Sequence, residues 1–133
     1  TLVIPERPGN RRGDTLVNIL ENPNVGLLFI IPGIEDTLRV NGKAAIVKDD
    51  ELLDLTAHQG KRPVLNIVVQ VQEAFLHCAK AFKRSHLWDA DAQVPRNNLP
   101  SLAQMVHDHT NHEVCSLDEL ENYIEQSYKT RLY

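Results

Sequence analysis

The stretch Arg7-Pro8-Gly9-Asn10-Arg11-Arg12-Gly13-Asp14-Thr15 separates an apolar start of the chain from its first amphipathic segment. Residues 1–4 are β-branched or apolar and predict a strand, whereas the prolines and glycines from Pro5 to Gly13 exclude regular structure and predict a loop. Apolar residues then recur with helical spacing over 16–20, with Asp14 as a candidate N-cap, and Asn22-Pro23 ends the helix. The stretch therefore predicts a loop that leads directly into a short helix.

The composition of this loop is typical of a site for a phosphate monoester. Backbone N–H groups at a helix start, glycines that permit close approach and guanidinium groups that bind phosphate oxygens in pairs all favour a terminal phosphate. A solvated basic turn beside an acidic helix start is the alternative explanation of the same residues. The loop is not a P-loop, because it lacks the Gly-Lys-[Ser/Thr] sequence that contacts a triphosphate and magnesium.

Strand signals follow the helix. The apolar run 25–31, closed by Pro32-Gly33, predicts a buried strand. Alternation over 37–47 predicts a neighbouring strand, with Gly42 as a bulge or a point of close approach. An acidic start predicts a short helix over 49–58. The segment 63–75 then predicts a long strand whose odd-numbered residues face the core and whose residues Asn66, Gln70 and Gln72 largely face away.

The last third of the chain is predicted to be helical. The segment 77–88 is expected to finish the long strand and continue as a helical turn. A helix is expected near 101–110, and Ser116-Leu-Asp-Glu119 is a capping box that opens another. Short strands with turn signals, interrupted by helices too brief for regular βαβ units, favour an α+β protein that is mainly β: an antiparallel barrel with peripheral helices. A doubly wound sheet is the weaker alternative.

Length and charge limit the possible functions. The 133 residues suffice for one domain, with 99–133 as a C-terminal helical extension. A net charge of −4 argues against a surface for nucleic acid, and no apolar run reaches the roughly 20 residues of a membrane-spanning helix. Two widely spaced cysteines, Cys78 and Cys115, favour reduced thiols in a cytoplasm.

Several blocks of the sequence together resemble one known family. They comprise the run from Ile4 to Leu16, the segment from Asn18 to Gly42 with Glu21-Asn22-Pro23 and Thr37-Leu38-Arg39-Val40-Asn41-Gly42, the block from Phe75 to Asp89, and the C-terminal Tyr128 to Tyr133. In this order they are similar to the FMN-binding, pyridoxamine 5′-phosphate oxidase-related family of bacterial proteins. The resemblance implies a split β-barrel homodimer with FMN at the subunit interface, and an oxidoreductase whose small-molecule substrate the residues do not identify.

The resemblance also implies roles for individual residues. Arg11 and Arg12 would bind the FMN phosphate, with Asn10 and Thr15 as neutral donors, and Pro5 and Glu6 would lie beside the flavin through their backbone. Thr37 would reach the cofactor from a neighbouring strand. A second block, which we call the closing block, would complete the site from the same or from the partner subunit. Its members are Lys80, Arg84, Ser85 and Trp88.

Part of the family's pattern is not matched. The upstream strands of a usual member have no counterpart, so we expect roughly its first third to lie outside this sequence. No residue can be named catalytic on this basis. A non-enzymatic binding module of the same fold, holding flavin, a deazaflavin or haem, is the competing function.

Three other features of the sequence have both a functional and a structural explanation. His107, Asp108, His109 and His112 are metal-ligand types, but His107 and His109 at i and i+2 point to different faces of a helix, so no metal is predicted. His77-Cys78 could supply a thiol nucleophile, yet a packed Cys78 is the favoured explanation. Trp88, the only tryptophan, is equally explained as a core anchor.

Overall fold

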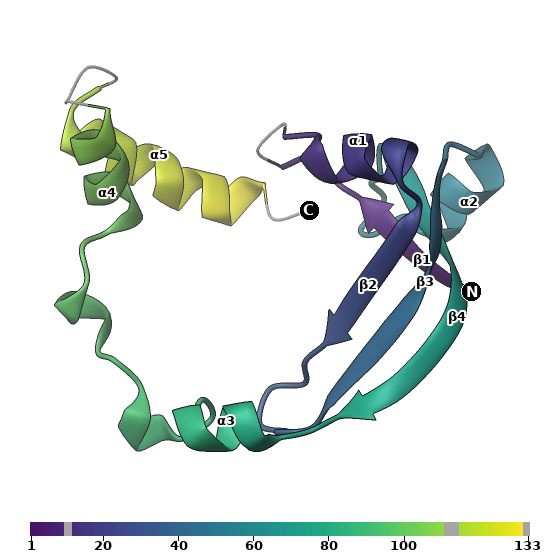
Figure 1. The fold of residues 1–133 in the computed structure, drawn as a ribbon. Helices are drawn as coiled ribbons and strands as arrows, with labels where there is room; N and C mark the ends of the chain where they lie inside the picture. Colours follow the sequence, from purple (N-terminus) through teal and green to yellow (C-terminus); the bar gives the residue numbers. More distant parts are fainter. Residues whose placement is uncertain (10–11, 111–114, 132–133) are drawn as a thin grey trace. The chain divides into compact units, whose positions relative to one another are not determined.

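The computed structural model describes residues 1–9, 12–110 and 115–131. The chain divides into two compact units, Thr1–Ala92 and Gln93–Tyr133. The first unit contains all four strands and the helices α1, α2 and α3, and the second contains the helices α4 and α5 (Figure 1). The boundary falls close to residue 99, where the sequence predicts the start of a helical extension.

One antiparallel sheet organises the first unit, with strand order β1-β4-β3-β2. Its strands are β1 (Leu2–Glu6), β2 (Asn24–Phe29), β3 (Thr37–Val47) and β4 (Leu65–His77). The long central strands β3 and β4 pair with each other, and each carries one shorter edge strand. The α+β class and the antiparallel pairing predicted from the sequence are confirmed.

Strand β1 extends further than predicted, because Pro5 and Glu6 belong to the strand and not to the loop. Pro5 pairs with Asn66 and Glu6 with Leu65. Proline is tolerated on an edge strand, since the missing N–H faces away from the only neighbour. The loop therefore begins at Arg7.

Gly42 marks the irregularity in the central pair, as the sequence predicts. The register of β3 with β4 shifts between Asn41 and Gly42. A Cβ added at Gly42 would lie 2.4 Å from Gln70 O and 3.0 Å from Val69 Cγ1. Glycine is therefore required here by the close approach of the β4 backbone.

The core lies on one face of the sheet, beneath α1 (Asp14–Glu21). Ile19 of α1 packs with Ala44 of β3 and with Ile67 and Val69 of β4. The helix begins one residue earlier than predicted, because Gly13 and not Asp14 is the N-cap, and no side chain of the described residues caps this end. The predicted end of this helix before Pro23 is confirmed.

Within the first unit, the described helices leave the same face of the sheet uncovered beyond α1. Phe29, Leu38 and Leu76 are in register across β2, β3 and β4, so their side chains share a face, and they are 40%, 38% and 79% exposed. The prediction of a fully buried β2 is wrong for the isolated chain, because β2 is an edge strand at this uncovered end. We call the row Phe29, Leu38 and Leu76 the open apolar row.

On the opposite face, α2 (Asp50–Leu55) contacts β4 and buries Asn66, which the sequence predicts to be on a polar face. Asn66 is 0% exposed, and among the described residues neither Nδ2 nor Oδ1 has a hydrogen-bond partner. Asn66 does lie on the face opposite to the core, as predicted, but its burial there was not predicted, because alternation along a strand does not reveal that a helix covers the second face. The helix itself is capped by Asp49, whose side chain accepts from Leu52 N.

The end of β4 leads into α3 (Lys80–Ser85), as predicted. Cys78 lies between them and is exposed, and its Sγ accepts the N–H of Lys80 at 3.4 Å. The expectation of a packed Cys78 is wrong, because β4 runs past the part of the sheet that the helices cover.

The second unit contains two helices, α4 (Leu102–His109) and α5 (Leu117–Thr130), which pack against each other. Ser101 caps α4 through the N–H of Gln104, and the predicted capping box of Ser116 with Glu119 is confirmed. No helix of the described residues combines the length and apolarity needed to span a bilayer.

Candidate flavin phosphate site

A cavity of about 350 Å³ lies where β1 leads through the loop into α1. One wall comes from the strand end and the loop, and the other from α1 and the start of β4. Its lining residues are Glu6, Arg7, Pro8, Gly9, Arg12, Gly13, Leu16, Val64 and Leu65. The loop chosen from the sequence is therefore a wall of a cavity in the folded chain.

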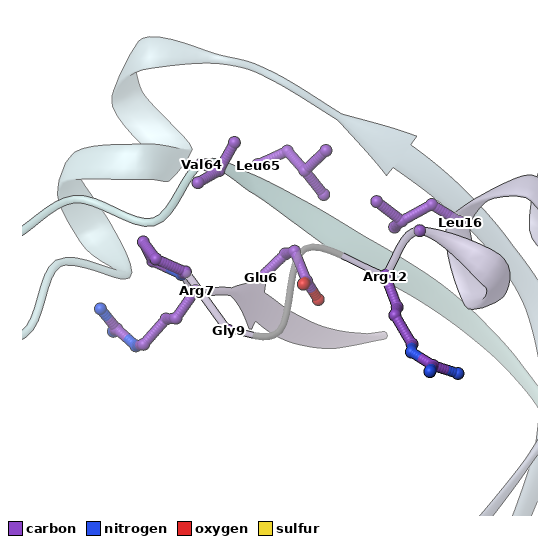
Figure 2. A pocket seen from close by; sticks show the side chains of 9 residues that line it. Glu6, Arg7, Gly9, Arg12, Leu16, Val64 and Leu65 are labelled. Atoms are coloured by element: carbon purple, nitrogen blue, oxygen red, sulfur yellow. The ribbon is translucent and has the colours of Figure 1, made fainter. Parts of the chain in front are cut away.

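The cavity has a charged side and an apolar side. Figure 2 shows Glu6 between Arg7 and Arg12, whose side chains extend in different directions, with Leu16, Val64 and Leu65 across from them. Such a lining suits a ligand with an anionic end and an apolar body. Arg12 and the start of α1 are the parts of this lining that would attract an anion.

The start of α1 supplies backbone donors beside Arg12. The first i to i−4 hydrogen bond of the helix runs from Val17 N to Gly13 O at 2.9 Å. The amides from Asp14 to Leu16 precede this bond, so they have no acceptor within the helix. Within the described part of the chain no side chain caps this end. Together with the helix dipole, these amides favour an anion.

The predicted phosphate residues are only partly within the described residues. Arg12 lines the cavity, and Thr15 is an exposed residue in the first turn of α1. Asn10 and Arg11 lie outside the described residues. The backbone carbonyl of Glu6 accepts the N–H of Val64 at 2.9 Å, so this carbonyl is already engaged within the chain, and Figure 2 shows the side chain of Glu6 at the cavity.

The structure does not bring the other predicted residues to this cavity within one chain. Thr37 pairs with His77 at one end of β4, whereas Glu6 pairs with Leu65 at the other. With 13 residues at about 3.3 Å each, the ends of β4 are up to roughly 40 Å apart. Figure 1 shows α3 at the end of β4 away from α1. The closing block therefore lies at the far end of the sheet.

Trp88 of the closing block has structural contacts of its own. Its Nε1–H donates to Ile34 O at 2.9 Å, and its ring stacks on Phe82 with centroids 6.0 Å apart. Nearby, Lys83 pairs with Glu35, which raises the pKa of Lys83, chiefly through this hydrogen bond. These contacts join the α3 segment to the β2–β3 connection. Thr37, at the end of that connection, is 3% exposed.

Unlike Trp88, the two cationic residues of the closing block are not held by side-chain contacts within the described part of the chain. Among the described residues, the side chains of Lys80 and Arg84 form no hydrogen bond or ion pair, and both residues are exposed. The hydroxyl of Ser85 donates to Phe82 O at 3.1 Å. Two cations thus belong to the helix that follows β4, at the end of the sheet opposite to Arg12.

The histidines of α4 do not assemble a metal centre in the described residues, where no group of three or more potential ligands occurs. His107 lies 3.9 Å from Asp108 through Nδ1 and Oδ1. His112 lies outside the described residues.

An α+β protein with a four-stranded antiparallel sheet and a cavity where a loop leads into a helix is the class that these observations define. Residues 1–78 match the family model described as pyridoxamine 5′-phosphate oxidase, and the chain belongs to this family. Members of the family usually bind flavin and often form dimers. The matched segment contains the whole sheet and ends at Cys78, before the closing block. No curated protein and no solved structure gave a significant match.

Proposed function

We propose that this chain is an FMN-binding flavoprotein and an oxidoreductase of the pyridoxamine 5′-phosphate oxidase kind, built as a split β-barrel. The cavity at the junction of β1 and α1 carries the proposal, since it combines Arg12, helix amides and an apolar wall in one lining. Arg12 and the amides from Asp14 to Leu16 would hold the phosphate, with Arg11, Asn10 and Thr15 completing the set.

Bound flavin would supply hydride or electron transfer, while the protein supplies binding and electrostatics. The polar side of the cavity would orient the cofactor through its phosphate. Leu16, Val64 and Leu65 would exclude water from the less polar part of the ligand. The substrate is a small molecule of unassigned class, and the two free cysteines support a reducing, cytoplasmic setting.

We also propose a homodimer with FMN at its interface. The open apolar row and the neighbouring Ile30, Ile31 and Ile34 form an exposed apolar surface of the kind that marks interfaces. Within one chain the closing block is separated from the cavity by the length of β4. In a symmetric dimer, Pro5, Glu6 and Arg12 of one subunit would face Thr37, Lys80, Arg84, Ser85 and Trp88 of the other.

The test compares FMN with riboflavin, which lacks the phosphate. Arg11→Ala with Arg12→Ala should weaken FMN by roughly 10- to 150-fold, because a charge-assisted hydrogen bond is worth about 1.5–3 kcal/mol, and should leave riboflavin nearly unchanged. Arg39→Ala, an exposed arginine of β3, is the control and should not affect either ligand. Equal losses for both ligands would remove these arginines from the phosphate site.

A further inference from the structure

Arg7 is the first residue after β1, and its guanidinium reaches the connection between α2 and β4. Nη2 donates to Thr56 O at 2.9 Å, and Nη1 makes a longer contact with Lys61 O at 3.4 Å. Thr56 is the C-cap of α2, and Lys61 O also accepts the N–H of His58 at 3.0 Å. One side chain thus binds both ends of the segment 56–61.

This contact is placed at the edge of the cavity. Arg7 and Val64 both line it, and the bond from Val64 N to Glu6 O lies immediately beside Arg7. After Arg7, Pro8 and Gly9 are exposed, and neither forms a hydrogen bond within the described part of the loop. Arg7 therefore anchors the loop at the point where it leaves β1.

We infer that Arg7 is a positioning residue for the proposed flavin site, which acts by holding the loop and not by binding the phosphate. The inference rests on the proposed function for the identity of the ligand. Two carbonyl oxygens on different parts of the chain suit the planar fork of a guanidinium, whereas a lysine ammonium offers a single point of charge. Releasing Arg7 would detach the β1 end of the loop from the segment 56–61.

The experiment compares Arg7→Lys and Arg7→Ala with a matched control, Arg62→Ala. Arg62 also attaches the start of β4 to α2, through Asp50 and Asp54, but it does not line the cavity. Two readouts are measured below the thermal unfolding of each variant. The first is FMN affinity by fluorescence titration, and the second is amide hydrogen exchange of the peptide 8–16 without ligand.

We expect both Arg7 variants to weaken FMN by about tenfold or more, which corresponds to 1.4 kcal/mol, and to speed exchange in the peptide 8–16. The Arg62 variant should match the wild type in both readouts. An Arg7→Lys variant with wild-type affinity would assign Arg7 to the phosphate through its charge and overturn the inference. Equal effects in the Arg62 variant would overturn it too, because they would indicate general loosening.

Failure of the proposed function has a separate signature. A wild-type chain that does not bind FMN would contradict the flavin assignment, while the exchange measurement would still decide whether Arg7 anchors the loop. Unchanged exchange in both Arg7 variants would overturn the anchoring role whatever the ligand.

Discussion

Replacing Gly42 by alanine tests the packing of the two central strands. The new Cβ would lie 2.4 Å from the carbonyl oxygen of Gln70, which is backbone and cannot swing aside as a flexible side chain does. Overpacking typically costs about 1–3 kcal/mol, and a backbone contact this short favours the upper part, about 2–3 kcal/mol. Since 1 kcal/mol shifts the Tm of a 60–100-residue domain by about 4–8 °C, the loss should be roughly 8–24 °C.

Gly26→Ala is the matched control, because Gly26 lies in the neighbouring strand opposite Asn41. Its new Cβ would meet only Asn41 Oδ1, at 3.4 Å, which is an ordinary van der Waals contact. This variant should stay within about 1 kcal/mol of the wild type, since an alanine in a strand loses less backbone entropy than a glycine. Thermal and urea unfolding followed by far-UV circular dichroism measure both variants. A Gly42 variant as stable as the Gly26 variant would refute the close approach of β3 and β4.

Three further predictions concern the surface of the first unit. Leu76→Glu should convert the proposed dimer to a monomer in light scattering, because it places a charge in the open apolar row, whereas Leu55→Glu, at a position on α2 that is 80% exposed, should leave the dimer intact. A Leu76→Glu variant that remains dimeric would exclude this row from the interface. Trp88→Ala should lower the free energy of unfolding by about 2–3 kcal/mol, because the ring stack and the hydrogen bond are both lost, and Trp88→Phe should lower it by about 1 kcal/mol. If Trp88→Phe instead keeps the stability of the wild type but loses affinity for FMN, the indole contacts the cofactor. The hydrogen bond from Arg62 lowers the pKa of Asp54 below 3.8, so the ionised carboxylate stabilises the folded chain above that pH, and this stabilisation is lost as the pH falls through the lowered pKa. The stability of Asp54→Asn should therefore fall less steeply with acid than that of the wild type, and an unchanged pH profile would contradict the pairing.

Local patterns in the sequence predict most of the elements of this fold. Alternation of apolar and polar residues predicts β3 with its observed bounds, and Gly42 predicts the register shift between β3 and β4. The Ser116 capping box predicts the start of α5. These features depend on neighbouring residues, so a single sequence contains the information. The family resemblance, confirmed over residues 1–78, agrees with them.

Features set by distant contacts were not predictable in the same way. The burial of Asn66 depends on α2, which covers the second face of β4, and the exposure of β2 depends on its place at the edge of the sheet. Arg7 was placed in the loop, but its bonds to Thr56 and Lys61 join residues 49 and 54 positions away. The separation of Arg12 from the closing block follows only from the register and length of β4.

The absorption spectrum of the purified chain, with identification of the compound released on heating, tests the flavin assignment most directly. The account predicts a yellow protein with the absorbance bands of an oxidised flavin, and release of FMN in about one equivalent per subunit. Released riboflavin without phosphate would contradict the role of Arg12 and the α1 amides. A colourless chain that also fails to take up added FMN would contradict the central claim.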